Sequence, residues 1–156
     1  MRFIRYFVQQ RYYRRTGPIV LASYGRLGLA TGFDQDLIPA DRFFAGGGNS
    51  VRGYAEDVLS PIDLLGDPVG GNSVFVLNQE VRFPIMKYLA GVGFFDAGRA
   101  FAKVADLSLR DLSTSTGFGL RIRTPVVLLR VDYGLPFDSS VGPRNGRWFF
   151  SIGQMF

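Results

Sequence analysis

The chain has 156 residues, a net charge of +5, and neither cysteine nor histidine. This length suits one domain or a part of one. Without cysteine there is no disulfide framework, thiolate metal site or cysteine nucleophile, and without histidine the commonest general base and metal ligand are absent. We therefore expect neither an enzyme nor a bound metal or cofactor.

Apolar and polar residues alternate along most of the chain, with the period of a β-strand rather than that of a helix. In chain order this alternation predicts about seven strands, at residues 4–12, 21–33, 74–85, 89–101, 117–123, 126–137 and 147–156. No apolar run approaches the ~20 residues that a membrane-spanning helix needs. The basic N-terminal segment contains Arg2 and Arg5 but lacks the apolar core of a secretory signal.

The two faces of the predicted strands differ in chemistry. In residues 74–85, Phe75 and Leu77 fall on one face, and Asn78 and Glu80 on the other. Across the strands, the polar faces carry arginines and acids, namely Arg5, Arg11, Arg26, Arg82, Arg121, Arg123 and Arg130 with Glu80, Asp96 and Asp132. Such charges are difficult to bury in a dry soluble core, whereas lipid outside and water inside suit both faces. The sequence predicts an all-β fold of antiparallel transmembrane β-barrel strands.

The connections between the predicted strands alternate in length. Short turns fall at residues 15–18, 86–88 and 124–125, and long loops at 34–71, 103–113 and 138–146. Short turns on one side and long loops on the other are typical of an up-and-down barrel in the bacterial outer membrane, although a soluble antiparallel sheet also alternates. We expect the long loops on the cell surface and the end of the chain at the periplasmic rim.

The loop at residues 34–71 contains an arginine, Arg52, beside a glycine-rich run. A guanidinium keeps its charge in proteins, and its planar fork of donors suits carboxylate partners. The alternation places Glu80 and Asp96 on the polar, lumenal face of the next two strands. If the loop folds back into the barrel, Arg52 meets both acids, and the glycines allow the tight turns that this requires. The alternative is an exposed arginine on a mobile loop.

Several stretches carry a resemblance to a known family. The stretch RFFAGGGNSVRGY (residues 42–54) resembles the in-folded loop of the outer-membrane insertase superfamily, which contains the BamA and TamA type barrels and the bacterial surface antigens. The following strands of that family are similar, in the same order, to NQEVRFPI (78–85), GVGFFDAGRAF (91–101), GFGLRIRTPVVLLRVDYGLPF (117–137) and FFSIGQMF (149–156). The resemblance covers about residues 20–156.

The resemblance implies a role for the loop. In this family the arginine of the VRG[FY] motif docks in the lumen against one acidic residue on each of the next two strands, which implies Arg52 with Glu80 and Asp96. The other positions of the loop motif are Gly46, Gly47, Val51, Gly53 and Tyr54. The family's barrels have sixteen strands and follow periplasmic domains that bind client polypeptides. Residues 1–156 would then be the C-terminal portion of such a barrel, with no second domain.

Seven strands are too few to close a bacterial membrane barrel. We therefore expect a truncated product or partial sequence whose partners are outer-membrane lipid, client polypeptides and the missing N-terminal part of the same protein. Pairing of two copies into a larger barrel has no support in the sequence.

The function that the resemblance implies is assistance in the insertion or translocation of outer-membrane proteins. The seam between the first and last strands opens, and the last strand, at residues 149–156, pairs with a client strand. Gly153 is its flexible point, and Phe150 and Phe156 resemble the C-terminal signal of outer-membrane strands. The alternatives are a polypeptide secretion pore, the barrel of a patatin-like phospholipase, and a porin or adhesin, which the Arg52 loop disfavours. A soluble nucleic-acid binder built on glycine, arginine and aromatic residues is more remote, and we expect no nucleic-acid partner.

Overall fold

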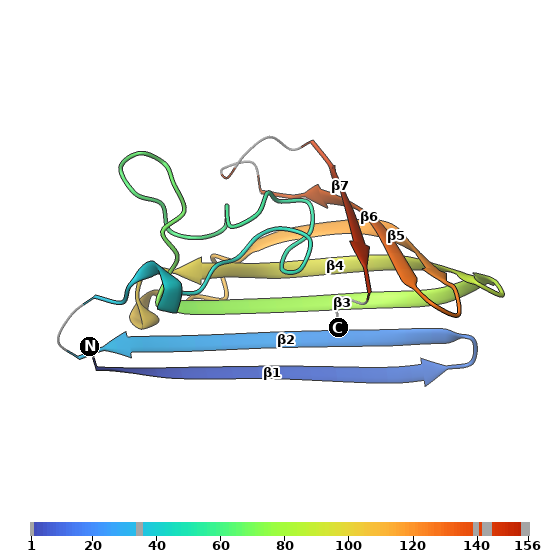
Figure 1. The fold of residues 1–156 in the computed structure, drawn as a ribbon, viewed down its shortest axis with the longest axis horizontal. Helices are drawn as coiled ribbons and strands as arrows, with labels where there is room; N and C mark the ends of the chain where they lie inside the picture. Colours follow the sequence, from blue (N-terminus) through green and yellow to red (C-terminus); the bar gives the residue numbers. More distant parts are fainter. Residues whose placement is uncertain (1, 34–35, 139–140, 142–144, 154–156) are drawn as a thin grey trace.

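A computed structural model describes residues 2–33, 36–138, 141 and 145–153. Seven strands within these residues form one antiparallel sheet. Its strands are β1 (Phe3–Thr16), β2 (Ile19–Gly32), β3 (Ser73–Met86), β4 (Leu89–Phe101), β5 (Ser113–Arg123), β6 (Leu128–Pro136) and β7 (Arg147–Ile152). Each strand pairs with the next in chain order, with the short turns at one end of the sheet and the long loops at the other (Figure 1). The prediction of seven antiparallel strands is confirmed.

Two short 3-10 helices lie in the long connections, η1 (Pro39–Asp41) and η2 (Val104–Asp106). No helix among the described residues is long and apolar enough to cross a membrane.

Some strand boundaries differ from the predicted ones. β5 begins at Ser113 rather than at residue 117, because the polar stretch from Ser113 to Thr116 pairs with β4 although its hydropathy does not alternate. β6 begins at Leu128 because Thr124 and Val127 close a turn, in which the Thr124 amide donates to the Val127 carbonyl at 2.9 Å. The predicted seventh strand ran to residue 156, and residues 154–156 lie outside the described ranges.

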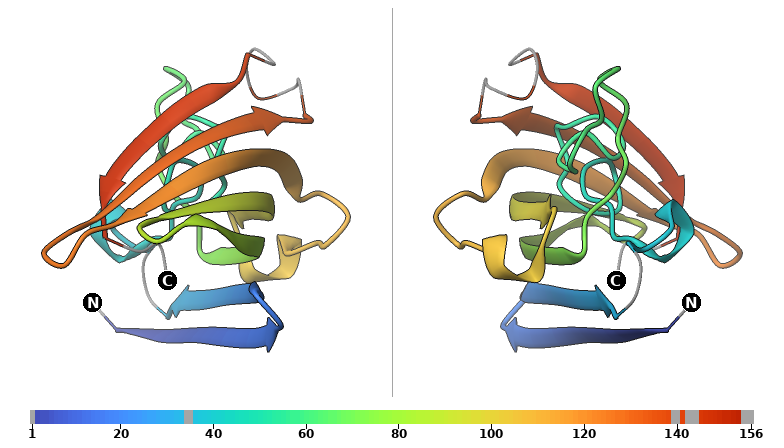
Figure 2. Two further views of the ribbon diagram at one scale, coloured as in Figure 1. Left: turned by 90° about the vertical axis from the view of Figure 1, so that its right-hand side faces the viewer. Right: turned by 90° about the vertical axis from the view of Figure 1, so that its left-hand side faces the viewer.

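The sheet is curled, and residues 36–71 lie inside its curve (Figure 2). On β3, Val76, Asn78 and Glu80 face this loop and are buried, whereas the outward-facing Val81 and Phe83 are each 44% exposed. A soluble domain shows the opposite arrangement, with apolar side chains inside and charged ones outside. Apolar outward faces and buried polar inward faces are those of a membrane β-barrel wall.

The largest hydrophobic cluster lies between the loop and the inner face of the sheet. The loop contributes Leu37, Phe43, Ala45, Val51, Tyr54 and Leu59, and the strands contribute Ala30, Val74, Val76 and Ala100. The loop therefore supplies the apolar packing that a second layer supplies in a sandwich.

The strands shorten toward the C-terminal edge of the sheet. β1, β2 and β3 have 14 residues each, β5 and β6 have 11 and 9, and the described part of β7 has 6. Within the described residues, β1 pairs only with β2 and β7 only with β6, so that each presents one edge without a strand partner.

Candidate functional site

The loop approaches the sheet most closely at two facing glycines. Gly53 has a φ of +94°, which favours glycine, and a Cβ on it would lie 3.1 Å from the carbonyl carbon of Gly134. A Cβ on Gly134 would in turn lie 2.5 Å from the Gly53 nitrogen. Because neither residue has a side chain, the backbone of the loop rests directly on the backbone of β6.

Arg52, next to this contact, is completely buried. Its Nε and Nη2 atoms donate to the two oxygens of Asp96, both at 2.7 Å, and its backbone amide donates to Asp96 Oδ2 at 3.1 Å. Its Nη1 atom donates to Glu80 Oε1 at 2.6 Å and to Asp132 Oδ2 at 3.3 Å. The Arg52 Cζ atom lies 3.5 Å from the centroid of the Phe94 ring. All three nitrogens of the planar fork donate to carboxylates, and an aromatic ring covers one face of the guanidinium.

The acids hold this guanidinium in its charged form. Burial alone would lower the pKa of Arg52, but the hydrogen bond and charge of Asp96, together with the charges of Glu80 and Asp132, raise it above its ordinary value. Arg52 therefore stays charged in this buried position.

A wider ion-pair network surrounds Arg52. Asp132 accepts from Arg121 Nη1 at 2.6 Å and from Arg130 Nε at 2.5 Å, and Glu80 accepts from Arg121 Nη2 at 3.2 Å. We call Arg52, Arg82, Arg121, Arg130, Glu80, Asp96 and Asp132 the docking network. Its members come from the loop and from β3, β4, β5 and β6.

Arg121, Arg130 and Asp132 were predicted on the polar face of their strands but were not predicted as part of the site. The signal lies in the strand register. Arg121 and Arg130 are directly opposite each other on β5 and β6, and like charges in that position repel. An acid between them was therefore required, and Asp132, two residues along β6, supplies it.

The other residues of the loop motif surround the arginine. Gly46 and Gly47 have φ values of +114° and +90°, and a Cβ on Gly47 would overlap the Glu56 carboxylate, which accepts from the Gly48 amide at 3.1 Å. Val51 is completely buried in the hydrophobic cluster.

Tyr54 connects the loop to β5. Its hydroxyl donates to the carbonyl of Thr114 at 2.9 Å and accepts from the backbone amide of Asp138 at 3.2 Å. Burial raises the pKa of Tyr54, so its neutral form, which can donate, is favoured.

The loop reaches toward both edges of the sheet. At one end, the Phe43 ring stacks on Phe7 of β1 with 6.0 Å between the ring centroids, and the Arg5 Cζ atom lies 4.6 Å from the Phe43 ring centroid. At the other end, Arg130 Nη2 donates to the carbonyl of Gly48, and a Cβ on Gly48 would lie 2.9 Å from the Phe149 ring of β7. The loop thus spans the inner face from β1 to β7.

The structure does not bring the predicted C-terminal residues to this network. Phe150 points outward on β7 and is 73% exposed, next to Trp148 at 6.5 Å between ring centroids. Gly153 has a φ of +103°, and its amide donates to the carbonyl of Leu128 at 2.7 Å. Phe156 lies outside the described residues.

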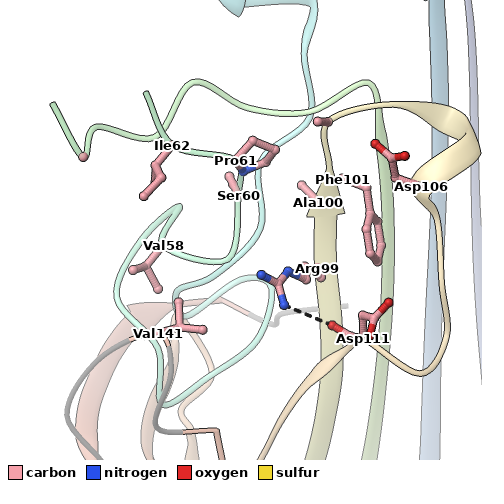
Figure 3. Close-up of a pocket in the computed structure, with 12 residues that line it drawn as sticks. Val58, Ser60, Pro61, Ile62, Arg99, Ala100, Phe101, Asp106, Asp111 and Val141 are labelled. Carbon is pink, nitrogen blue, oxygen red and sulfur yellow. Dashed lines mark hydrogen bonds between the residues drawn. The ribbon is translucent and has the colours of Figure 1, made fainter. Parts of the chain in front are cut away.

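An open cavity of about 740 Å³ lies at the long-loop end of the sheet. Figure 3 shows Arg99 directed toward Asp111, whose backbone oxygen accepts from Arg99 Nη1 at 3.3 Å, and Val58 and Val141 on another wall. Within the described residues, no cluster of three or more His, Cys, Asp or Glu side chains is arranged to hold a metal ion. The docking network joins the loop to four strands of the sheet.

Three proteins are similar in sequence to this chain. An outer membrane protein assembly factor BamA of Nitratidesulfovibrio vulgaris is 35% identical over 162 residues, which covers 99% of this chain and 20% of that protein. A SAM50-like protein of Schizosaccharomyces pombe is 31% identical and covers 78% of this chain and 28% of its own length. Outer envelope protein 39 of Arabidopsis thaliana chloroplasts is 30% identical, over 78% of this chain and 32% of its own length. The chain thus spans a third or less of these relatives.

The fold is also that of a solved barrel. The crystal structure of BamA from Haemophilus ducreyi lacking POTRA domains 1–3 matches 97% of this chain and 35% of its own, with a TM-score of 0.77 and 18% identity. The resemblance to BamA-type barrels that was inferred from the sequence is therefore confirmed. The Omp85 superfamily domain matches residues 1–156, and the chain belongs to the Omp85 superfamily.

Proposed function

We propose that this chain is the C-terminal part of a β-barrel of the bacterial outer membrane that assists the insertion or translocation of other proteins. The observation that carries the proposal is the loop that Arg52 holds across the inner face of the sheet. Because this loop contacts strands from β1 to β7, it controls the curvature of the barrel wall that these strands form. In this orientation the apolar outward faces contact lipid, the short turns lie in the periplasm, and the long loops lie at the cell surface.

The edge of β7 that has no strand partner among the described residues is the proposed contact for a client polypeptide. A strand edge offers backbone N–H and C=O groups that pair with an incoming extended segment. Arg130 and Phe149, which hold β6 and β7 against Gly48, support an arrangement in which the loop sets the angle of this edge. The client's own strand thereby satisfies backbone groups that lipid cannot satisfy.

The shortening of the strands supports the same location. Nine residues of β6 extend for about 30 Å and fourteen residues of β1 for about 48 Å at the ordinary rise of a strand. A bilayer that matches the long strands must thin where it meets the short ones. Such a thinned region lowers the barrier for a client strand entering beside β7. No step of this process requires a catalytic residue, and we propose a non-enzymatic role.

The test uses the whole protein that carries this chain, reconstituted in liposomes with an unfolded outer-membrane client. Arg52→Ala should reduce client insertion, measured by protease protection, and Arg52→Lys should not fully restore it, because lysine lacks the planar fork that engages Asp96 and Glu80. Arg110→Ala, on an exposed loop, is the matched control and should insert the client normally. Unchanged insertion in Arg52→Ala would refute the proposal. Passage of a soluble polypeptide without insertion of the client would favour a secretion pore instead.

A further inference from the structure

A groove of about 460 Å³ lies on the outward face of β1–β4, on the side of the sheet away from the docked loop. The strand register aligns Tyr12, Ser23, Gln79 and Phe95 in one row across these four strands. Tyr12 and Phe95 form the two walls of the groove, because both are large and exposed. Gly93 leaves the floor open, because a Cβ added to it would meet nothing within 4 Å.

The floor of the groove is polar although the surrounding face is apolar. Ser23 Oγ donates to Gln79 Oε1 at 2.6 Å. The Gln79 amide nitrogen carries two N–H donors, and neither has a hydrogen-bond acceptor within the described residues. On a surface that faces hydrocarbon, an N–H group without a partner costs several kcal/mol. A molecule with an acceptor oxygen in the groove would satisfy this donor.

A cation lies in the adjacent row, closer to the short turns. The register aligns Arg14 with Leu21, Val81 and Gly93, and Arg14 is exposed at the rim of the groove. Two residues along a strand separate the rows by about 7 Å. Arg14 on β1 and Gln79 on β3 are also two strand spacings apart, so their Cα atoms lie about 12 Å from each other, with Arg14 on the side toward the membrane surface.

The charges at the two ends of the sheet differ in sign. The turn-end segments, residues 11–20, 82–91 and 121–128, contain no Asp or Glu. The exposed cations of these segments include Arg14, Arg15, Lys87 and Arg123. The long loops, in contrast, carry most of the acids outside the docking network, such as Asp41, Glu56, Asp57, Asp63, Asp67, Asp106 and Asp111. An end that is positive and free of acids suits a leaflet of lipids with anionic phosphates.

We propose that the groove binds one glycerophospholipid of the leaflet at the turn end. Arg14 binds its phosphate, the glycerol lies over Gly93 in the same row, the Gln79 amide donates to an ester carbonyl, and an acyl chain continues past Tyr12 and Phe95 toward the middle of the membrane. The Arg14 and Gln79 side chains both line the groove, and a glycerophospholipid carries its phosphate and its ester carbonyls one glycerol apart, so that one lipid can reach both. The inference rests on the membrane orientation proposed above and not on the insertion of clients.

The experiment counts the phospholipids that the whole protein retains. The protein is reconstituted in phosphatidylglycerol and phosphatidylethanolamine, extracted into detergent, and weighed by native mass spectrometry without any client polypeptide. The unchanged protein should retain one phospholipid through delipidation. Arg14→Gln and Gln79→Leu should each reduce the retained fraction by about tenfold, the effect of losing one charge-assisted or otherwise unsatisfied hydrogen bond. Gly93→Val should abolish retention by filling the groove.

Two variants serve as matched controls. Arg123→Gln removes an exposed cation at the same end of the sheet, and Gly25→Val adds a side chain on the same face at a position where a Cβ also meets nothing within 4 Å. Both should retain the lipid as the unchanged protein does. Equal retention in Gly93→Val, or equal losses in the Arg14 and Arg123 variants, would overturn the proposal. Because no client is present, this result is independent of the insertion test.

Discussion

The segment of the docked loop from Phe43 to Arg52 is attached to the sheet by different interactions at its two ends, which we call the aromatic end and the arginine end. Phe43 lies against β1 and β2 through a stacked ring and a cation over its face, with no ion pair. Arg52 lies against β3, β4 and β6 through carboxylates that leave none of its surface exposed. Apolar contacts adjust to small displacements, whereas a buried charge without its partner is strongly unfavourable. The difference implies that the arginine end sets the position of the loop and the aromatic end follows it.

Asp96→Ala should have the largest effect. Asp96 accepts three hydrogen bonds from Arg52, and without them the buried guanidinium loses its bidentate partner, at a cost of about 3–5 kcal/mol. A buried reporter cysteine at Ser50, in a chain that has no other cysteine, should then be labelled by a maleimide roughly a hundredfold faster or more. Asp67→Ala, on an exposed part of the same loop, should leave the rate unchanged. Slow labelling in Asp96→Ala would show that the ion pairs do not hold the loop.

Gly134→Val tests the backbone contact beside the arginine. A Cβ there would lie 2.5 Å from the Gly53 nitrogen, so the loop must move away from β6, and overpacking of this kind costs about 1–3 kcal/mol. Urea unfolding of the membrane-inserted protein, together with labelling of the Ser50 cysteine, measures both consequences. Gly25→Val, where a Cβ meets nothing within 4 Å, should be close to neutral. Equal behaviour of the two glycine variants would remove the argument for close docking.

Phe43→Leu tests the aromatic end of the loop. The substitution removes the stacking on Phe7 but keeps an apolar side chain, and we expect a loss of about 1 kcal/mol in unfolding free energy. Because Phe43 and Asp96 share no partner, the double variant should show additive losses within about 0.5 kcal/mol. Strong coupling between the two would contradict the view that the ends of the loop are attached independently.

Much of this arrangement could be predicted from the sequence. The alternation of side chains identifies the strands and assigns each residue to a face, which is why Glu80 and Asp96 stood out as inward-facing acids on consecutive strands. This prediction uses local information, because each strand is identified from the alternation of its own residues. It failed at the start of β5, where the buried Ser113 and Ser115 belong to a strand without any apolar alternation.

The rest of the site depends on the curl of the sheet. Asp132 lies 80 residues from Arg52 in sequence and meets it only because β6 curves around the loop. The contact of Gly53 with Gly134 has the same origin, and so does the bond from Arg130 to Gly48. The hydropathy of a strand specifies which way a side chain points but not how strongly the sheet bends. Contacts between the loop and strands across the curved sheet could therefore not be predicted from the sequence.

Phe150→Ala should have the smallest effect on stability. It distinguishes the contribution of Phe150 to the stability of the barrel from its contribution to insertion of the protein into the membrane. The Phe150 side chain is 73% exposed on the outward face, and truncating an exposed side chain changes the unfolding free energy by less than about 0.5 kcal/mol. If the C-terminal aromatic residues act as a signal for membrane assembly, the amount of inserted protein in cells should nevertheless fall. Phe118→Ala, an outward aromatic residue on β5 that is 57% exposed, should leave that amount unchanged. Equal amounts of inserted protein in both variants would mean that Phe150 is only one more lipid-facing side chain, and the signal would then have to lie elsewhere in the last strand.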